Sequence, residues 1–484
     1  METLSDADIF VKNTAKTVDN LYYPTFHVAA ESGWINDPNG LIYINGYYHF
    51  FFQHYPYSAE WGPMHWGHVI SKDLVHWEHL PIALYPDQDY DRGGCYSGSA
   101  VDNNGVFTLI YTGNVWLGAE GDDTHIRQVQ CMATSTDGIN FIKHGPVLYP
   151  PEGIMHFRDP KVWRARDSWW MVVGARPQTN LGEVRLYQSP NLTDWTFVRI
   201  LDQATTSQEG FMWECPDFFN VNNKDILITS PQGIDAQGYD YRNHFQSGYR
   251  CGVWEKDSSY TVQEEFKEID HGHDFYAPQS FTAADGRRIM VGWMNMWNST
   301  MPTQKQGWAG AFTLPREVNY NEHGRLLCTP ITELEQLRSD YNALKPFSLT
   351  NMRVGLATQY QEYKISFDLA KSTAERYGFT IGDGAKIFID SQSKRLVLER
   401  LSTDLTLNTE RSIPLVACSK INLHIFVDAS SIEIFVNDGE YTLTSNFYPS
   451  AGNNTVTFYT ENGKAVVSSV ECWKLANIFS SCSE

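Results

Sequence analysis

Three short segments each place an acidic side chain among turn-forming and aromatic residues, directly before a run that is typical of a β-strand. The segments are residues 34–40 (WINDPNG), 157–160 (FRDP) and 213–217 (WECPD), and their leading acids are Asp37, Asp159 and Glu214. A fold that gathers these strand starts would place three carboxyl groups in one pocket. Cleavage of a glycosidic bond requires one carboxylate as nucleophile or base and one carboxylic acid as proton donor.

The sequence surroundings of the three acids differ, so different roles are expected. Apolar neighbours flank Glu214, and burial beside apolar groups keeps a carboxylic acid protonated near neutral pH. Asp37 follows Asn36 and precedes a Pro-Asn-Gly turn, where amide and backbone N–H groups would keep it ionised. Asp159 follows Arg158, a partner expected to hold it charged and suited to gripping sugar hydroxyls.

Each segment alone also has a structural interpretation, as a turn, an ion pair or a solvent-facing strand end. The common spacing of the three segments favours the catalytic interpretation.

Seven histidines, some of them closely spaced, are candidate metal ligands: His54, His65, His68, His76, His79, His271 and His273. They form no H-E-x-x-H pattern, so packing or hydrogen bonding is the expected role and no metal is predicted.

A repeat of about 60 residues underlies the region 34–315, which is rich in strand-like runs separated by Asn-Gly and Asp-Gly turns. The expected strand starts at Asp37, Ser97, Asp159, Glu214 and Tyr276 lie 60, 62, 55 and 62 residues apart. A second series, Ser-x-(Asp/Asn)-x-x-x-(Trp/Phe), occurs at 71–77, 135–141 and 189–195. Five units of about four strands predict a five-bladed β-propeller whose first strands line the axis.

The pattern of predicted secondary structure changes after residue 315. Residues 329–338 predict a short helix, and alternating strands resume from about residue 360, which indicates a β-sandwich. The sequence thus predicts an all-β chain: an N-terminal extension (1–22), a propeller (23–325), a helical linker (326–345) and a C-terminal sandwich (346–484).

The net charge of the chain indicates which classes of binding partner to expect. The chain has 484 residues and a formal net charge of -20, which disfavours nucleic acid and anionic membranes and suits a neutral small-molecule substrate. No signal peptide or membrane span is visible, so a cytoplasmic location is expected, with a mature secreted chain as the alternative. Sequons at Asn191, Asn298 and Asn453 matter only in the latter case. Eight scattered cysteines indicate neither a zinc site nor a disulfide scaffold. Monomer and homodimer remain open.

The three segments closely resemble the signature blocks of glycoside hydrolase family 32, the β-fructofuranosidases, and the likeness extends from about Tyr23 to the last strand. It is closest to the bacterial-type sucrose hydrolase and sucrose-6-phosphate hydrolase branch. One departure is Ile35, where the family usually has Met, an apolar exchange that leaves the chemistry unchanged.

The resemblance implies a five-bladed propeller followed by a β-sandwich and a retaining hydrolysis of terminal β-fructofuranosides without a cofactor. It implies Asp37 as nucleophile, Glu214 as acid/base and Asp159 as transition-state stabiliser. It also implies a fructosyl pocket lined by Asn36, Gln53, Trp61, Ser97, Arg158 and Tyr276, with Trp61 and Trp293 as aromatic walls.

Two alternatives share this sequence pattern. A fructosyltransferase would use the same covalent intermediate, and a non-catalytic carbohydrate-binding propeller would have lost an acid, although all three are present here. Sucrose and sucrose 6-phosphate also remain to be distinguished. A phosphate would need clustered cations near the pocket mouth, for which Arg242, Arg250 and Lys305 are the candidates.

Overall fold

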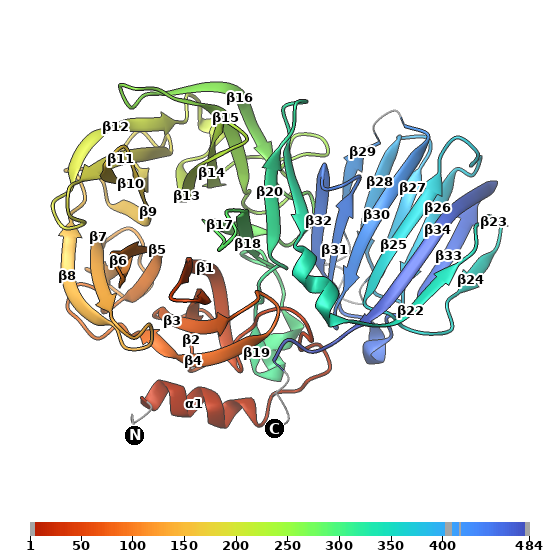
Figure 1. Cartoon of the computed structure of the whole chain (residues 1–484), viewed down its shortest axis with the longest axis horizontal. Coiled ribbons are helices and arrows are strands. Elements are labelled where there is room, and N and C mark those ends of the chain that lie inside the picture. Colours follow the sequence, from red (N-terminus) through yellow and green to blue (C-terminus); the bar gives the residue numbers. More distant parts are fainter. Residues whose placement is uncertain (1–4, 402–408, 416–417, 480–484) are drawn as a thin grey trace.

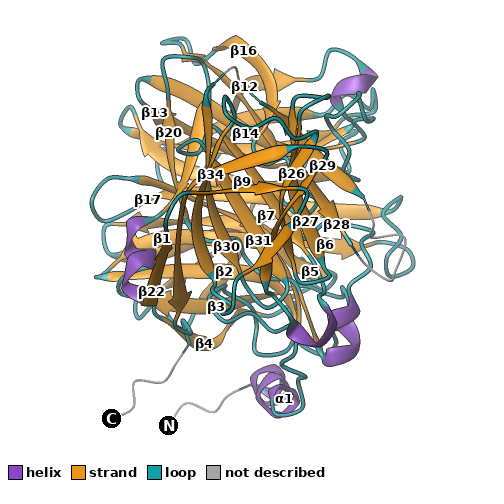
Figure 2. Ribbon diagram, turned by 90° about the vertical axis from the view of Figure 1, so that its right-hand side faces the viewer, coloured by secondary structure: helices purple, strands orange, loops and turns teal. Residues whose placement is uncertain are grey.

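The computed structural model describes residues 5–401, 409–415 and 418–479, and it is built almost entirely of β-strands. Five sheets surround a common axis in the first two-thirds of the chain, and two further sheets stack beside them (Figure 1). Figure 2 shows the few helical turns at the periphery of this strand-built body. The predicted five-bladed propeller followed by a β-sandwich is confirmed.

The blades follow one another in chain order. The first contains β1 (Gly33–Ile44), β2 (Tyr47–Tyr55), β3 (His65–Ser71) and β4 (Trp77–Leu84). The second contains β5 (Gly94–Asn103), β6 (Val106–Trp116), β7 (Ile126–Ser135) and β8 (Ile142–Leu148). The third contains β9 (His156–Ala165), β10 (Ser168–Arg176), β11 (Glu183–Ser189) and β12 (Thr196–Gln203).

The fourth blade contains β13 (Met212–Val221), β14 (Lys224–Gln232), β15 (Gly248–Trp254) and β16 (Tyr260–Glu268). The fifth contains β17 (Tyr276–Thr282), β18 (Arg288–Trp293), β20 (Arg316–Tyr320) and β21 (Leu326–Pro330). Between β18 and β20, the short strand β19 (Trp308–Ala309) pairs in parallel with β1. This pairing closes the ring between the last blade and the first.

The first strands β1, β5, β9, β13 and β17 contact their neighbours around the axis, so residues far apart in sequence meet there (Figure 1). The serine motif has a different place, because it forms the turn from the third to the fourth strand of three blades. The hydroxyl of Ser71 accepts the N–H of Leu74, and Asp73 accepts the N–H of His76. The copies at 135–141 and 189–195 repeat these bonds. The repeated motif therefore specifies a turn rather than the site.

The sandwich consists of a seven-stranded and a six-stranded sheet. The seven-stranded sheet is ordered β22 (Arg338–Leu344), β34 (Lys464–Leu475), β25 (Glu362–Asp368), β30 (Lys420–Val427), β31 (Ser431–Val436) and β32 (Tyr441–Asn446), with β23 (Phe347–Thr350) also on β34. The six-stranded sheet is ordered β24 (Arg353–Gly355), β33 (Val456–Glu461), β26 (Arg376–Ile381), β27 (Ala385–Asp390), β28 (Arg395–Arg400) and β29 (Glu410–Pro414). Alternate residues from both sheets, such as Ile365 and Ile387, share one hydrophobic core.

Helical structure is sparse in the described part of the chain. It comprises α1 (Asp6–Ala15) and the 3-10 turns η1 (Ser207–Glu209), η2 (Pro302–Gln306), η3 (Thr332–Leu337) and η5 (Ser450–Gly452). Asp8 fixes α1 to the first blade by accepting the backbone N–H of Ile82 and the hydroxyl of Tyr85. In the described ranges, no helix has the length and apolar character needed to cross a membrane.

The expected helical linker, residues 326–345, differs from the structure in detail. Its first residues form β21, which pairs with β20, and its last residues form β22, which pairs with β34. Only η3 lies between them, as a 3-10 turn shorter than the helix expected over 329–338. We therefore propose that the propeller extends to Pro330 and that the sandwich begins at Arg338.

Candidate active site

A β-bulge interrupts the first strand of every blade at the equivalent place. The register to the second strand shifts between Ile35 and Pro38, Cys95 and Gly98, Arg158 and Lys161, Glu214 and Asp217, and Tyr276 and Gln279. Three of these bulges have a proline among their unpaired residues, Pro160, Pro216 and Pro278, which suits a position that donates no ladder hydrogen bond. Bulges next to active sites re-aim side chains, and here five of them face one axis.

The bulges create two sets of side chains around the axis. One set, here called the outer ring, consists of Asn36, Tyr96, Arg158, Glu214 and Tyr276. The residues that directly follow these in the chain form the other set, here called the inner ring, and are Asp37, Ser97, Asp159, Cys215 and Ala277. Asp159, Cys215 and Ala277 have positive φ angles of 69°, 48° and 51°. Such a backbone conformation is unfavourable for non-glycine residues and clusters at functional sites.

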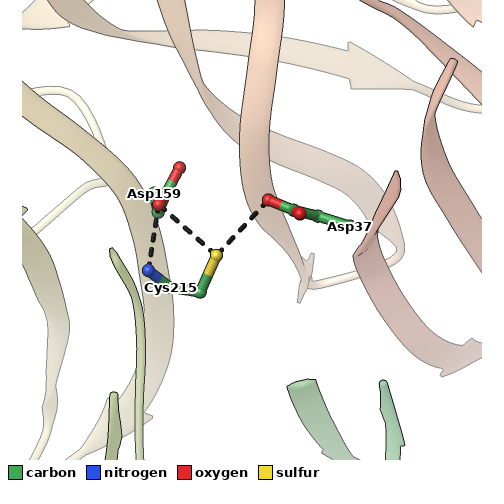
Figure 3. A group of neighbouring side chains, drawn as sticks. All are labelled: Asp37, Asp159 and Cys215. Carbon is green, nitrogen blue, oxygen red and sulfur yellow. Dashed lines mark hydrogen bonds between the residues drawn. The ribbon is translucent and has the colours of Figure 1, made fainter. Parts of the chain in front are cut away.

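The inner ring joins two carboxylates through a thiol (Figure 3). Cys215 Sγ donates to Oδ2 of Asp37 and to Oδ2 of Asp159, at 3.4 Å in each case. The backbone N–H of Cys215 also donates to Asp159 at 2.9 Å, and the hydroxyl of Ser97 donates to Asp37 at 2.6 Å. Asp37 and Asp159 are therefore held in fixed orientations within one hydrogen-bond network.

The outer ring holds the third acid. Nε and Nη2 of Arg158 donate to Oε1 of Glu214 at 3.0 and 2.8 Å, and the hydroxyl of Tyr276 donates to Oε2. Asn36 Nδ2 reaches across to Asp37 at 3.2 Å and so links the two rings. Both oxygens of Glu214 are thus engaged, although its side chain keeps 14% of its surface exposed toward the cavity.

Three expectations about the acids require correction. Arg158 pairs with Glu214 rather than with Asp159, because successive residues of a strand point in different directions and Arg158 and Glu214 both belong to the outer ring. For the same reason Cys215, not Glu214, joins Asp37 and Asp159 in the inner ring. The apolar setting expected for Glu214 is also wrong, since a guanidinium and a phenol surround its carboxyl group.

Burial dominates the electrostatics of the two aspartates. It raises the pKa of Asp37 to about 6, and the charge of Glu214 adds to this effect, while hydrogen bonds from Ser97, Asn36 and Cys215 oppose it. Burial likewise raises the pKa of Asp159 to about 7, with Glu214 adding to it and Arg158 opposing it. The expectation that neighbours keep both aspartates firmly ionised is therefore too simple.

A cavity of about 290 Å³ opens onto the three acids. Eight of the ten expected site residues line it: Asn36, Asp37, Gln53, Trp61, Ser97, Arg158, Asp159 and Glu214. Tyr276 is buried behind Glu214 and acts through its hydrogen bond to that carboxyl group. Trp61 is the most exposed of the lining side chains predicted, at 37%, and its ring meets Tyr96 and Trp116 edge to face.

Trp293 is not an aromatic wall. Its exposed fraction is 0%, and its ring packs 6.0 Å from Trp34 and 4.9 Å from Trp297. Trp293 lies at the end of β18, where it pairs with Tyr276. Neighbouring side chains therefore separate it from the cavity. Trp297 lines the cavity in its place.

Sequence reasoning missed several lining residues: Met64, Tyr96, Trp116, Gly121, Asp123, Ile126, Gln128, His156, Gln232, Phe245 and Trp297. Tyr96 directly precedes Ser97, so the outer-ring spacing would have found it. Gln128 and His156 both contact Nη1 of Arg158 and so position the guanidinium. The others lie on loops or later strands, outside the repeat of first strands.

Two groups of potential metal ligands occur among the residues that the structure describes, Asp37–Asp159–Cys215 and Asp240–Glu268–His271. In the first group, burial raises the pKa of the Cys215 thiol well above its usual range, with the charges of Asp159 and Asp37 adding to the effect. A thiol ligand must be deprotonated to bind a metal, so this group is better suited to sharing protons than to holding a cation.

Comparison with known proteins agrees with this geometry. The model for the N-terminal domain of glycosyl hydrolases family 32 matches residues 27–330, and the model for the C-terminal domain of that family matches residues 333–474. Together they cover nearly the whole chain. The fold is that of a glycoside hydrolase, and the chain belongs to family 32.

Similar proteins match nearly the full length of the chain. A sucrose-6-phosphate hydrolase of Escherichia coli is 50% identical, with 94% of this chain and 95% of that protein covered. A raffinose invertase of Escherichia coli is 48% identical, with 98% and 99% covered. Among solved structures, the GH32 β-fructofuranosidase BmSUC1 of Bombyx mori superposes with a TM-score of 0.86 at 32% identity, covering 98% of both chains. A variant of that enzyme has been solved in complex with sucrose.

Proposed function

We propose that this protein hydrolyses terminal, non-reducing β-D-fructofuranosides, with sucrose as the representative substrate. The observation that carries the proposal is the arrangement of Asp37, Asp159 and Glu214 around one cavity, each with different hydrogen-bond partners. Two carboxyl groups with different partners can take the two roles that glycoside hydrolysis requires. The names of the relatives and the sucrose complex support the substrate class.

The proposed reaction has two steps. Asp37 attacks C2 of the fructosyl unit, the bond from C2 to the leaving oxygen breaks, and Glu214 gives its proton to that oxygen. Glu214 then removes a proton from water, which attacks C2 and releases fructose and the Asp37 carboxylate. Asp159 holds fructosyl hydroxyls as positive charge develops on the ring. The configuration at C2 is retained.

The roles of the other site residues follow from their contacts. Asn36, Gln53, Ser97 and Trp61 border the fructosyl position, and Arg158 sets the orientation of Glu214. Gln53 Nε2 is itself fixed by Asn39 Oδ1 and by the carbonyl of Cys95. Tyr276 acts on Glu214, and we assign no substrate contact to Trp293.

The charge of the cavity favours a neutral leaving sugar over a 6-phosphate. Among the described residues that line it, the permanently charged cation is Arg158, which pairs with Glu214. His156 also lines the cavity, but burial, assisted by the charges of Arg158 and Arg176, lowers its pKa to about 4. Asp123 adds negative charge to the lining. A phosphate would enter without a free guanidinium or ammonium partner.

The three cations suggested from the sequence do not supply one, because none of them lines the cavity. Arg250 is buried in ion pairs with Asp202 and Glu209. Nε of Arg242 donates to the carbonyl of Gly238, and Lys305 lies on η2. The prediction that these residues form a phosphate site is therefore unsupported.

Initial rates on sucrose and on sucrose 6-phosphate test the proposal. We expect kcat/KM to be at least about tenfold higher for sucrose, which corresponds to about 1.4 kcal/mol of transition-state binding. Product analysis at high sucrose should give free fructose rather than longer fructosides. A preference for the phosphorylated sugar would contradict the charge argument, and no fructose release from either sugar would contradict the function.

A further inference from the structure

One wall of the substrate cavity belongs to a long loop that reaches the sandwich. This loop, residues 233–247, connects β14 to β15 and is here called the 233–247 loop. Phe245 of the loop and Gln232 just before it line the cavity. Long loops without secondary structure of their own are uncommon in compact domains and are often functional.

Phe245 lies next to the tyrosine that binds Glu214. Its ring centroid is 6.0 Å from that of Tyr276, whose hydroxyl donates to Glu214. Because Glu214 gives its proton to the departing oxygen, side chains beside the Tyr276–Glu214 pair flank the departing sugar rather than the fructosyl ring. An aromatic ring at this place can cover an apolar sugar face.

The sandwich holds this loop through Arg411 of β29. Nε of Arg411 donates to Oδ1 of Asn243 at 2.9 Å, and Nη2 donates to the carbonyl of Arg242 at 3.1 Å. Asn243 in turn donates to the carbonyl of Gly272 and accepts Nε2 of Gln246 on its own carbonyl. Asn243 and Gln246, which precede and follow Phe245 in the sequence, are therefore fixed by hydrogen bonds.

Further contacts join the same surfaces. The guanidinium of Arg395, on β28, lies 3.9 Å from the ring centroid of Tyr239 in the loop. On the propeller side, the N–H of Tyr241 donates to Glu268 of β16. Burial lowers the pKa of Arg411 to about 10, with Arg400 adding to the effect, so its guanidinium remains charged at neutral pH. Hydrogen bonds from a charged donor are stronger than neutral ones.

We propose that Arg411 of the sandwich is a positioning residue for leaving-group recognition, which it achieves by holding Asn243 and thereby Phe245 against the departing sugar. The proposal rests on the proposed function. It assigns the sandwich a part in substrate specificity, although the sandwich supplies no lining side chain to the described cavity.

The test compares sucrose with methyl β-D-fructofuranoside, whose leaving group is too small to extend over Phe245. Arg411→Met keeps the stem of the side chain and removes its donors. We expect kcat/KM for sucrose to fall about tenfold, chiefly through KM, as for one lost pocket contact. Cleavage of the methyl fructoside should stay within about twofold. Arg353→Met, at the distant strand β24, is the matched control and should leave both substrates unaffected (Figure 1).

A second variant makes the mechanism of the effect testable. Phe245→Ala should give the same sucrose-specific loss, and the double variant should lose no more than Phe245→Ala alone, because Arg411 acts through Phe245. Additive losses, an equal loss on both substrates, or wild-type kinetics in Arg411→Met would overturn the inference. Failure of the wild-type protein to cleave either fructoside would instead overturn the proposed function, and this is seen before any variant is made.

Discussion

The guanidinium of Arg158 approaches Glu214 with two nitrogens, Nε at 3.0 Å and Nη2 at 2.8 Å, and both bind the same oxygen, Oε1. The hydroxyl of Tyr276 binds the other oxygen, Oε2. Glu214 is therefore fixed in orientation by groups from the third and fifth blades. A proton donor must point at the leaving oxygen, so this relationship sets the geometry of the first chemical step.

Removing the guanidinium should therefore affect chemistry more than folding. We expect Arg158→Leu to lower kcat on sucrose about a hundredfold, as a small misplacement of a reacting group can. Steady-state kinetics with a melting curve checks this. Arg164→Leu, on the exposed face of the same strand, is the control. A variant with normal kcat and a raised KM alone would show that Arg158 binds sugar without orienting the acid.

The pH dependence should reflect the raised pKa of Asp37. Asp37 must be ionised to attack, so kcat/KM should rise with pH as the proton leaves near pH 6. Glu214 is the leading charge that raises this pKa, so Glu214→Gln should move the acid limb to lower pH. The variant is assayed on a fructoside with a good leaving group, which needs no proton donor.

The exposed Glu322 offers a matched control, and Glu322→Gln should leave the acid limb in place. An unshifted limb in Glu214→Gln would show that another group controls the ionisation.

The thiol between the two aspartates should be unreactive. Burial and the charges of Asp159 and Asp37 raise the pKa of Cys215, and the thiol rather than the thiolate is the inert form. We expect iodoacetamide at about pH 8 to leave Cys215 unmodified and activity intact. The exposed Cys418 should be alkylated in the same sample and serves as the internal control in peptide mass mapping. Alkylation of Cys215 in the folded protein would contradict the assigned protonation.

A buried histidine should make stability depend on alkaline pH. His27 binds Asp428 through Nδ1 at 2.7 Å and Glu433 through Nε2 at 2.5 Å. Burial alone would lower its pKa, but these two acids outweigh burial and raise it to about 9. Since the folded value exceeds the unfolded one, this contribution is complete below about pH 6.5 and is lost as the pH rises through about 9.

We expect the free energy of unfolding to fall by on the order of a few kcal/mol over this interval. His27→Gln should be less stable at every pH, because it leaves buried carboxylates unpaired, but it should lose the slope between about pH 6.5 and 9. His76→Gln, at an exposed histidine, should keep that slope. Denaturant titrations at several pH values make the comparison, and an identical slope in His27→Gln would assign it to other groups.

The repeat in the sequence was sufficient to predict the propeller and the meeting of the acids. Strand starts at Asp37, Ser97, Asp159, Glu214 and Tyr276 recur because each blade repeats one hairpin pattern, and all five lie on first strands. The expected strand starts at Glu214 and Tyr276 lie one residue before the inner-ring residues Cys215 and Ala277. Periodicity locates an element to within a residue or two, whereas side-chain direction reverses with each residue of a strand.

That one-residue shift explains why the partner of Arg158 was predicted wrongly, and other residues of the site were missed for other reasons. The partner of Arg158 depends on which side of the bulge the guanidinium points to, and adjacency in sequence suggested Asp159. Phe245 and Trp297 lie on loops, whose course is set by contacts with the sandwich and with other loops rather than by a local pattern. A tryptophan such as Trp293 is a residue type that often stacks on sugars, but its place at the end of β18 buries it.

The most direct test of the central claim is to trap the sugar on the enzyme. Glu214→Gln, incubated with a fructoside that carries a good leaving group, should form the covalent intermediate and hydrolyse it slowly, because the base that activates water is missing. Mass spectrometry of the digested protein should then find one fructosyl unit on the peptide that contains Asp37. Turnover of this substrate with no adduct, or an adduct on Asp159 instead, would contradict the assignment of Asp37 as the nucleophile.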